Sequence, residues 1–266
     1  MKRDMYCQYA ISGKMIDNEI VIDAHMHIDF YNKFFMPSPD TPSIIANAKR
    51  LGIRKIYGSS LLAIRNDATA GNANVIETHK SHPDMFEPYL VVKPNYPEET
   101  ISIIELAKKY SINQFKLHDD GNGYPYDHKN YYPLYEHCNE HSSVILFHTY
   151  GNMHINPIRN IAAQFRSIKI LLAHSGIVDE SSYYDAAREH ENIHLETCNS
   201  LAWYGLIERM VDRVGADRIL WGTDMPFMSP DQQIGRVLFA RTSDDDKRKI
   251  LGQNALTLFD SALPNR

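Results

Sequence analysis

The side chains in this sequence that could do chemistry are mostly histidines and charged residues that end short apolar runs. The chain of 266 residues holds 13 histidines. Imidazole and carboxylate ligands together suit a borderline divalent cation such as zinc, and an open coordination position makes such a site catalytic. The polar residues at the ends of these runs are His25, His27, Lys116, His118, His148, His174, Glu196 and Asp224.

The elements that must position these side chains are short, β-rich apolar runs, each followed by a turn residue and then by a segment with helical spacing. Eight alternations, with strands apolar enough to be covered on both faces, predict a parallel sheet. At about 250 residues the economical closed form is a single-domain (β/α)8 barrel, with a doubly wound open sheet as the alternative. We expect residues 1–19 to be an N-terminal extension and 20–266 to be the barrel domain. The predicted strands cover residues 20–28, 53–60, 87–94, 112–118, 143–151, 168–176, 192–200 and 218–227.

Helical spacing and capping residues predict the connecting helices. Pro42 after Thr41 and Pro157 after Asn156 would each place proline at a first helical position behind a capping side chain. The predicted helices cover residues 41–51, 72–82, 98–110, 131–141, 156–166, 182–190 and 201–214, with further helix from about 230 to 263.

The carboxyl ends of all strands in a parallel barrel open onto one face, which is where this fold carries its active sites. Residues two apart on a strand share a face, so the polar end residues should point into the same mouth. The expected inward sets are Asp23, His25 and His27; Val144, Leu146 and His148; Ile170, Leu172 and His174; and Leu220, Gly222 and Asp224.

Each of these residues also has an ordinary structural explanation. A strand-end histidine such as His148 or His174 is usually a hydrogen-bonded structural group, and Asp224 in a Gly-Thr-Asp-Met-Pro turn could cap the next segment. Four separate strands would have to place a metal-ligand type at the same end by chance, which favours a shared functional site. For Cys198, which follows Glu196, we prefer a small buried residue over a nucleophile.

Composition excludes several other classes of function. The net charge is −5, from 28 basic and 33 acidic residues, and no basic stripe or polybasic segment is present to bind nucleic acid or a membrane surface. The N-terminus lacks the apolar stretch of a secretory signal, and no segment approaches the roughly 20 apolar residues of a membrane helix. The 3 cysteines are scattered, which predicts a reducing, cytoplasmic environment.

Six short motifs, in order, resemble the amidohydrolase superfamily. The resemblance is closer to its amidohydrolase-related branch, which includes proteins similar to aminocarboxymuconate semialdehyde decarboxylase. It runs from about residue 20 to the C-terminus, and the segments 123–138 and 249–259 also resemble parts of that branch. The motifs are HMH (25–27), KLH (116–118), LFHTYG (146–151), LAHSG (172–176), LET (195–197) and WGTDMPF (221–227).

The resemblance implies a distorted (β/α)8 barrel with one divalent metal, zinc first and manganese as the alternative. Its ligands would be His25, His27, His148 and Asp224, and the histidine of the sixth strand, His174, would activate the attacking water or bind a second metal. One metal is favoured over two. The lysine on the fourth strand, Lys116, is carbamylated in some relatives. Here Lys116 and His118 are expected to face the substrate or to support the ligands from behind.

The predicted function is hydrolysis of an amide, lactone or ester of a small molecule by a metal-activated water, with Asp224 and His174 as candidate bases. The first alternative is a metal-dependent nonoxidative decarboxylase of a small carboxylic acid, which would use the same metal to hold the carboxylate. The second is a barrel that binds metal or ligand without turnover. A homodimer is the default expectation for the assembly.

Overall fold

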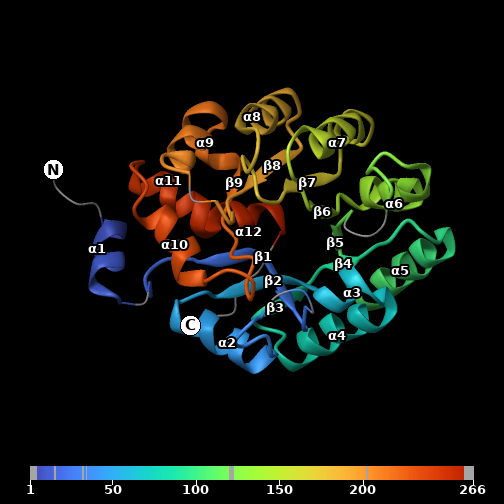
Figure 1. Ribbon diagram of the computed structural model, residues 1–266, viewed down its shortest axis with the longest axis horizontal. Coiled ribbons are helices and arrows are strands. Elements are labelled where there is room, and N and C mark those ends of the chain that lie inside the picture. The colour runs from blue at the N-terminus through green and yellow to red at the C-terminus, as the bar shows by residue number, and fades with distance from the viewer. Residues whose placement is uncertain are drawn as a thin grey trace.

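Parallel strands form the centre of the molecule and helices surround them (Figure 1). The computed structural model describes residues 5–14, 16–31, 33, 35–119, 123–201 and 203–260. Hydrogen bonds between strands follow the orders β1-β2-β3 and β4-β5-β6-β7-β8-β9, and every pair is parallel. The strands are β1 (Ile22–Ile28), β2 (Lys55–Ser60), β3 (Phe86–Pro88), β4 (Leu90–Val91), β5 (Gln114–Leu117), β6 (Val144–Phe147), β7 (Lys169–Leu172), β8 (Ile193–Glu196) and β9 (Ile219–Leu220).

Two junctions join these strands into a ring. β3 and β4 are halves of the predicted third strand, interrupted only at Tyr89, whose amide donates to the Gly58 carbonyl at 2.8 Å. On the other side, the Ala24 amide donates to the Trp221 carbonyl at 3.0 Å, so the segment after β9 lies beside β1. The eight predicted strands are therefore confirmed in a (β/α)8 barrel, and the open doubly wound sheet is not what forms.

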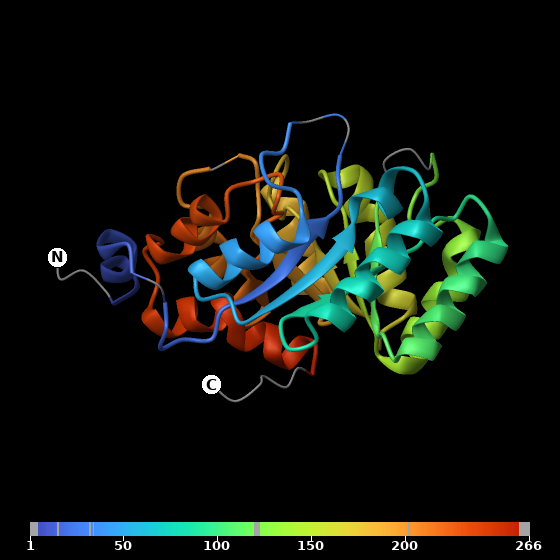
Figure 2. The ribbon, with the colours of Figure 1, turned by 90° about the horizontal axis from the view of Figure 1, so that it is seen from below.

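The helices follow the predicted alternation. Figure 2 shows the C-terminal helices, in red, on one side of the strands and the loop that follows β1, in blue, on the opposite side. The helices are α1 (Met5–Ser12), α2 (Thr41–Arg50), α3 (Leu61–Arg65), α4 (Ala68–Ser81), α5 (Pro97–Tyr110), α6 (Tyr132–His141), α7 (Asn152–Gln164), α8 (Glu180–Glu189), α9 (Leu206–Val214), α10 (Pro230–Leu238), α11 (Asp244–Arg248) and α12 (Asn254–Leu258), with a π-helical segment at Lys249–Gln253.

The two predicted helix caps, Thr41 and Asn156, were wrong. The cap of α2 is Asp40 rather than Thr41, because the Asp40 side chain accepts from the Ser43 amide at 2.9 Å. In α7, Pro157 lies inside the helix, which begins one turn earlier after Gly151 at φ 77°. Pro157 is the sixth residue of α7, beyond the first amides that lack a partner, so its missing N–H costs one intrahelical hydrogen bond.

The barrel interior is apolar below the site. Ile22 and Ala24 of β1 belong to this inner cluster, together with side chains from β6, β7 and β9. Phe259, just after α12, stacks on Tyr57 of β2 with ring centroids 3.7 Å apart and so closes the end opposite the loops. At the predicted extension, Tyr6 of α1 is fully buried, and α1 packs against α10 and α11. Among the described residues, no helix is long and apolar enough to cross a membrane.

Candidate metal centre and its cavity

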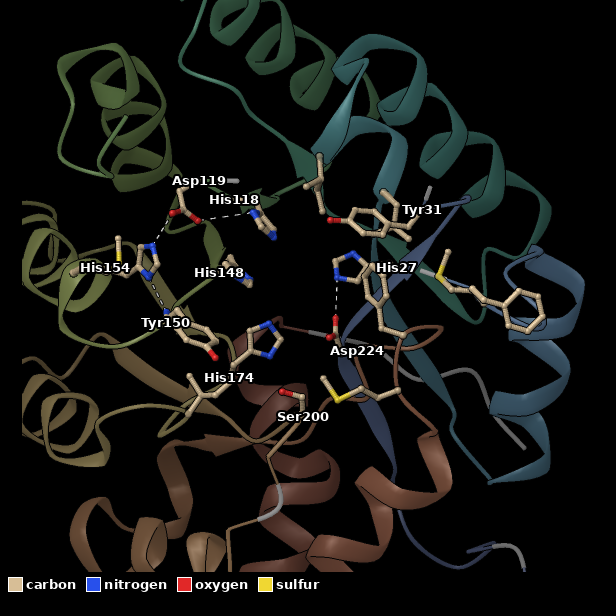
Figure 3. Close-up of a pocket in the computed structure, with 18 residues that line it drawn as sticks. His27, Tyr31, His118, Asp119, His148, Tyr150, His154, His174, Ser200 and Asp224 are labelled. Carbon is tan, nitrogen blue, oxygen red and sulfur yellow. Dashed lines mark hydrogen bonds and ion pairs between the residues drawn. The ribbon is translucent and has the colours of Figure 1, made fainter. Parts of the chain in front are cut away.

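A cavity of about 730 Å³ opens at the carboxyl ends of the strands (Figure 3). Five of the predicted site residues lie on its wall, while His25 and Lys116 are fully buried beneath it. Its described lining residues are His27, Tyr31, Phe35, Met36, Leu61, Ile64, His118, Asp119, His148, Tyr150, Met153, His154, His174, Ile177, Ser200, Asp224, Phe227 and Met228.

The backbone reaches this arrangement by departing from simple strand alternation. The pairing of β1 with β2 shifts register between Asp23 and Met26, so Ala24 lies in the inner cluster while His25 and His27 still converge on the site. A bulge of this kind re-aims a side chain. Asp23 does not face the cavity, since its carboxylate accepts hydrogen bonds from the Thr223 amide at 3.0 Å and the Thr223 hydroxyl at 2.5 Å.

The predicted face of β7 was wrong for the same kind of reason. Leu171 belongs to the inner cluster, whereas Ile170 and Leu172 belong to the outer core. His174 reaches the cavity because its backbone takes a left-handed conformation, with φ 57°. Asp224 does the same at φ 55°. Non-glycine residues adopt this conformation at a cost of about 1–3 kcal/mol, and such residues cluster at functional sites.

Two histidines and a carboxylate converge beneath and beside the cavity. Nε2 of His27 lies 3.0 Å from Oδ1 of Asp224, and Nε2 of His25 lies 3.7 Å from the same oxygen. The other nitrogen of each ring forms a hydrogen bond with a neighbouring side chain. Nδ1 of His27 lies 2.9 Å from the Ser59 hydroxyl, and Nδ1 of His25 lies 3.1 Å from Oε2 of Glu196. One ligand atom of each of His25, His27 and Asp224 thus lies within 4.8 Å of the other two. This donor set, with its supported imidazoles, fits a divalent cation.

His148, the fourth predicted ligand, lies across the cavity from this group. Its ring stacks on that of His118, with centroids 3.8 Å apart, and the centroid of His174 is 5.0 Å away. His148 forms a separate group of close ligand atoms with His118 and Asp119. The structure therefore brings three of the four predicted ligands together and places the fourth on the same wall as His118 and His174.

Lys116 lies behind the candidate ligands rather than on the cavity wall. Its Nζ is 3.2 Å from Nε2 of His25, and its side chain is fully buried. Burial lowers the pKa of this amine to about 8, against the nearby carboxylates that raise it. The position of Lys116 therefore does not support the prediction that it contacts substrate. It does support the alternative prediction, that Lys116 interacts with the ligand His25.

Glu196 is a functional candidate to which the sequence assigned no role beyond its position at a strand end. Besides His25, its Oε2 accepts from the His174 amide at 3.3 Å and from Sγ of Cys198 at 2.9 Å. Burial raises the pKa of Glu196 to about 8, against these hydrogen bonds. Cys198 is fully buried, as expected, and burial raises the pKa of its thiol well above the usual range.

Burial strongly affects the pKa values of the histidine and carboxyl groups at the cavity. Burial and the charge of Lys116 hold the pKa of His25 well below its usual value, and burial also lowers the pKa of His174. Nδ1 of His174 lies 3.2 Å from the Cys198 carbonyl, which can only accept, so Nδ1 carries the proton and Nε2 has a lone pair. Burial alone would raise the pKa of Asp224, but the hydrogen bond from His27 and nearby positive charge outweigh it and leave the pKa lowered. Asp224 and His174 are thus both proton acceptors at neutral pH.

Two further polar residues of the wall, Asp119 and His154, were not predicted as a pair. His154 donates from Nε2 to Oδ2 of Asp119 at 2.7 Å. In the sequence, Asp119 is the residue directly after the KLH motif, so its position at a strand end was the available signal. His154 lies on α7, four residues from Tyr150, and no strand pattern points to it.

A parallel barrel with a buried two-histidine, one-carboxylate centre at its mouth defines the class of metal-dependent barrel proteins. The model of the family described as Amidohydrolase matches residues 22–260, and the chain belongs to that family. No curated protein matches the chain.

Solved structures share the fold at low sequence identity. An uncharacterised TIM-barrel protein from Bordetella bronchiseptica is 19% identical over 90% of this chain and 97% of its own, with a TM-score of 0.75. A 2,6-dihydroxybenzoate decarboxylase from Rhizobium is 16% identical over 91% and 99%, with a TM-score of 0.73. A 5-carboxyvanillate decarboxylase from Novosphingobium aromaticivorans, complexed with manganese and 4-hydroxy-3-methoxy-5-nitrobenzoic acid, is 14% identical over 92% and 97%, with a TM-score of 0.74.

Proposed function

We propose that this protein is a metal-dependent nonoxidative decarboxylase of a small hydroxylated aromatic carboxylic acid. The observation that carries the proposal is the convergence of three candidate cation ligands, His25, His27 and Asp224, at the wall of a cavity lined largely by apolar and aromatic side chains. The activities of the structurally similar decarboxylases from Rhizobium and Novosphingobium aromaticivorans support it. It replaces hydrolysis, the function expected first from sequence.

The apolar wall favours loss of carbon dioxide. A carboxylate that enters the cavity leaves bulk water, and burying a charge without partners is costly. The proposed cation, manganese or zinc, would supply the positive charge that offsets the charge of this carboxylate. Tyr31, Phe35 and Phe227 offer aromatic surface for the ring. Carbon dioxide is neutral, so the apolar surroundings disfavour the reactant more than the product.

Side chains of the protein would transfer the proton that replaces the carboxylate. In the proposed reaction the bond between the ring and its carboxylate breaks, carbon dioxide leaves, and a proton takes its place on the ring carbon. Asp224 and His174 lie on the cavity wall, and among the described residues Oδ2 of Asp224 and Nε2 of His174 have no hydrogen-bond partner. Either side chain can therefore take a proton from solvent or from the ring hydroxyl and deliver it to carbon. His27 orients Asp224 through its 3.0 Å contact.

Hydrolysis of an ester, lactone or amide is the second candidate. The observation that favours it is the same pair of proton acceptors, since a water attacking a carbonyl needs a base. Asp224 is itself a candidate cation ligand, and His174 lies on the same cavity wall. The two candidates differ in their products, carbon dioxide or a new carboxylic acid with its alcohol or amine.

Product analysis tests the proposal. The purified full chain is loaded with manganese and incubated with 2,6-dihydroxybenzoate and 2,4-dihydroxybenzoate, and separately with phenyl esters, aryl lactones and anilides. We expect carbon dioxide and the matching arene in equal amounts, and at least about a 100-fold loss of rate in Asp224→Asn. Asp212→Asn, at a side chain 79% exposed, is the matched control.

Two outcomes would overturn the proposal. Ester, lactone or amide cleavage with no carbon dioxide would assign the protein as a hydrolase. Stoichiometric metal binding with no turnover of either substrate class would assign a barrel that binds without catalysis.

A further inference from the structure

We propose that Asp119, oriented by His154, is a second binding point in the cavity and selects substrates that carry a hydroxyl or amino group at the end away from their carboxylate. This inference rests on the proposed function, in that it assumes a carboxylate held at the cation ligands. Figure 3 shows Asp119 and His154 on one side of the cavity and His27 and Asp224 on the other.

Hydrogen bonds fix the direction in which His154 donates. The Tyr150 amide donates to Nδ1 of His154 at 2.7 Å, so this nitrogen carries no proton. The proton therefore sits on Nε2, which donates to Oδ2 of Asp119 at 2.7 Å. His154 is nine-tenths buried, with a side chain 9% exposed, while the Asp119 side chain is 28% exposed. The pair presents a carboxylate to the cavity and keeps its supporting imidazole covered.

The side chain that orients Asp119 packs against a buried tyrosine. Tyr126 is buried, and its hydroxyl donates to the His148 carbonyl at 2.6 Å. The ring of Tyr126 also packs near that of His154, with centroids 5.7 Å apart. His154, which orients Asp119, therefore has a buried neighbour that supports it, as a binding group needs to hold its geometry.

The second oxygen of Asp119 has no hydrogen-bond partner among the described residues, so it can bind a ligand. Oδ1 lies 3.9 Å from Nδ1 of His118, too far for a hydrogen bond. Among the described residues that line the cavity, none is lysine or arginine. A carboxylate such as Asp119 only accepts hydrogen bonds, so the group that it binds must be a donor. A second carboxylate on the ligand would instead be repelled there.

Binding of para-substituted benzoates tests the proposed role of Asp119 without requiring turnover. The probes are benzoate, 4-hydroxybenzoate, 4-aminobenzoate and terephthalate, and their dissociation constants are measured by calorimetry on the manganese-loaded full chain. We expect 4-hydroxybenzoate and 4-aminobenzoate to bind on the order of 10-fold more tightly than benzoate, because each would hydrogen-bond to a charged group. Terephthalate should bind more weakly than benzoate.

Substitutions test whether Asp119 causes the preference for a para hydroxyl or amino group over a second carboxylate. In Asp119→Asn the amide oxygen would accept from His154 and the NH2 group would face the ligand, so the preference should reverse in favour of terephthalate. Asp119→Leu should remove both preferences, and Asp212→Asn should keep the wild-type order. His154→Gln, which retains an N–H donor, should preserve more of the preference than His154→Phe.

The outcomes separate this inference from the proposed function. An unchanged ratio of dissociation constants in both Asp119 variants would overturn the inference, even if the protein releases carbon dioxide from aromatic acids. The expected ratios in a protein that turns over no carboxylic acid would support the binding point and reject the proposed activity.

Discussion

At the scale of single residues, the candidate metal centre depends on groups that hold the far sides of its imidazoles. Glu196 contacts Nδ1 of His25, and Ser59 contacts Nδ1 of His27, which leaves both Nε2 atoms directed toward Asp224. Such partners fix the tautomer and ring orientation of a histidine ligand, and losing one typically costs 10- to 100-fold in metal affinity. The strand ends therefore supply the ligands, and neighbouring strands supply their orientation.

Glu196→Gln should weaken binding of manganese by about 10-fold or more. A bound cation would favour the ionised form of Glu196, and a carboxylate is a stronger acceptor for the His25 N–H than an amide. Equilibrium dialysis of metal measures this. Glu105→Gln, at a side chain 65% exposed on α5, is the matched control. If Glu196→Gln is folded and binds manganese as tightly as the wild type, Glu196 does not support the metal ligands.

His118 should make the metal-free protein sensitive to mild acid. Burial, followed by the charge of Lys116, holds the pKa of His118 well below its usual value. The unfolded chain takes up this proton as the pH falls through about 6.5, while the folded state resists it, so the stabilisation present above pH 6.5 is lost below it. Between pH 7 and 5, wild type should lose about 2 kcal/mol more unfolding free energy than His118→Phe.

Denaturant unfolding after chelator treatment measures the effect of pH on both proteins. The same substitution at His141, at the exposed end of α6, is the control. Parallel pH profiles for wild type and His118→Phe would contradict the assignment of this sensitivity to His118.

At the scale of elements, the sequence predicted which strands end in the site but not how each chain segment turns there. The alternation of apolar runs was sufficient for the barrel order, and the polar end residues were sufficient to locate its mouth. The bulge in β1 and the left-handed backbone at His174 and Asp224 break the two-residue repeat on which the face assignments relied. These departures depend on contacts between distant segments, such as the Asp224 amide donating to the His25 carbonyl at 2.8 Å, which no local pattern encodes.

The close approach of the last strand to the first predicts a strict need for glycine at position 222. A Cβ there would lie 2.6 Å from Oε1 of Glu196 and 2.8 Å from Cβ of His25. Gly222→Ala should therefore cost about 1–3 kcal/mol of unfolding free energy and also weaken metal binding, both measured on one preparation.

Gly235→Ala, in α10, is the matched control, since nothing lies within 4 Å of the added Cβ. It should leave metal binding unchanged and stability equal or higher by up to about 1 kcal/mol. Similar losses in both variants would show that the Gly222 contact is not the cause.

At the scale of the whole molecule, the predicted extension is packed onto the barrel away from the metal ligands. Tyr6 of α1 is fully buried, and Glu19 forms an ion pair at 3.1 Å with Arg248, the last residue of α11. Because α1 contacts α10 and α11 rather than the strands that carry the ligands, its loss should affect stability and not the metal centre.

Tyr6→Ala should accordingly lower the unfolding free energy by about 3 kcal/mol and leave manganese affinity unchanged, as measured by denaturant unfolding and dialysis. Ile11→Ala, on the same helix at a side chain 49% exposed, should change stability by less than about 0.5 kcal/mol. A loss of manganese affinity in Tyr6→Ala would link the extension to the site and contradict this separation.

The most direct test of the account is anomalous diffraction from crystals of the manganese-loaded protein, recorded on both sides of the manganese edge. We predict one peak within bonding distance of Nε2 of His25, Nε2 of His27 and Oδ1 of Asp224, and loss of that peak in His27→Ala. A manganese peak elsewhere, with these three atoms left uncoordinated, would contradict the account.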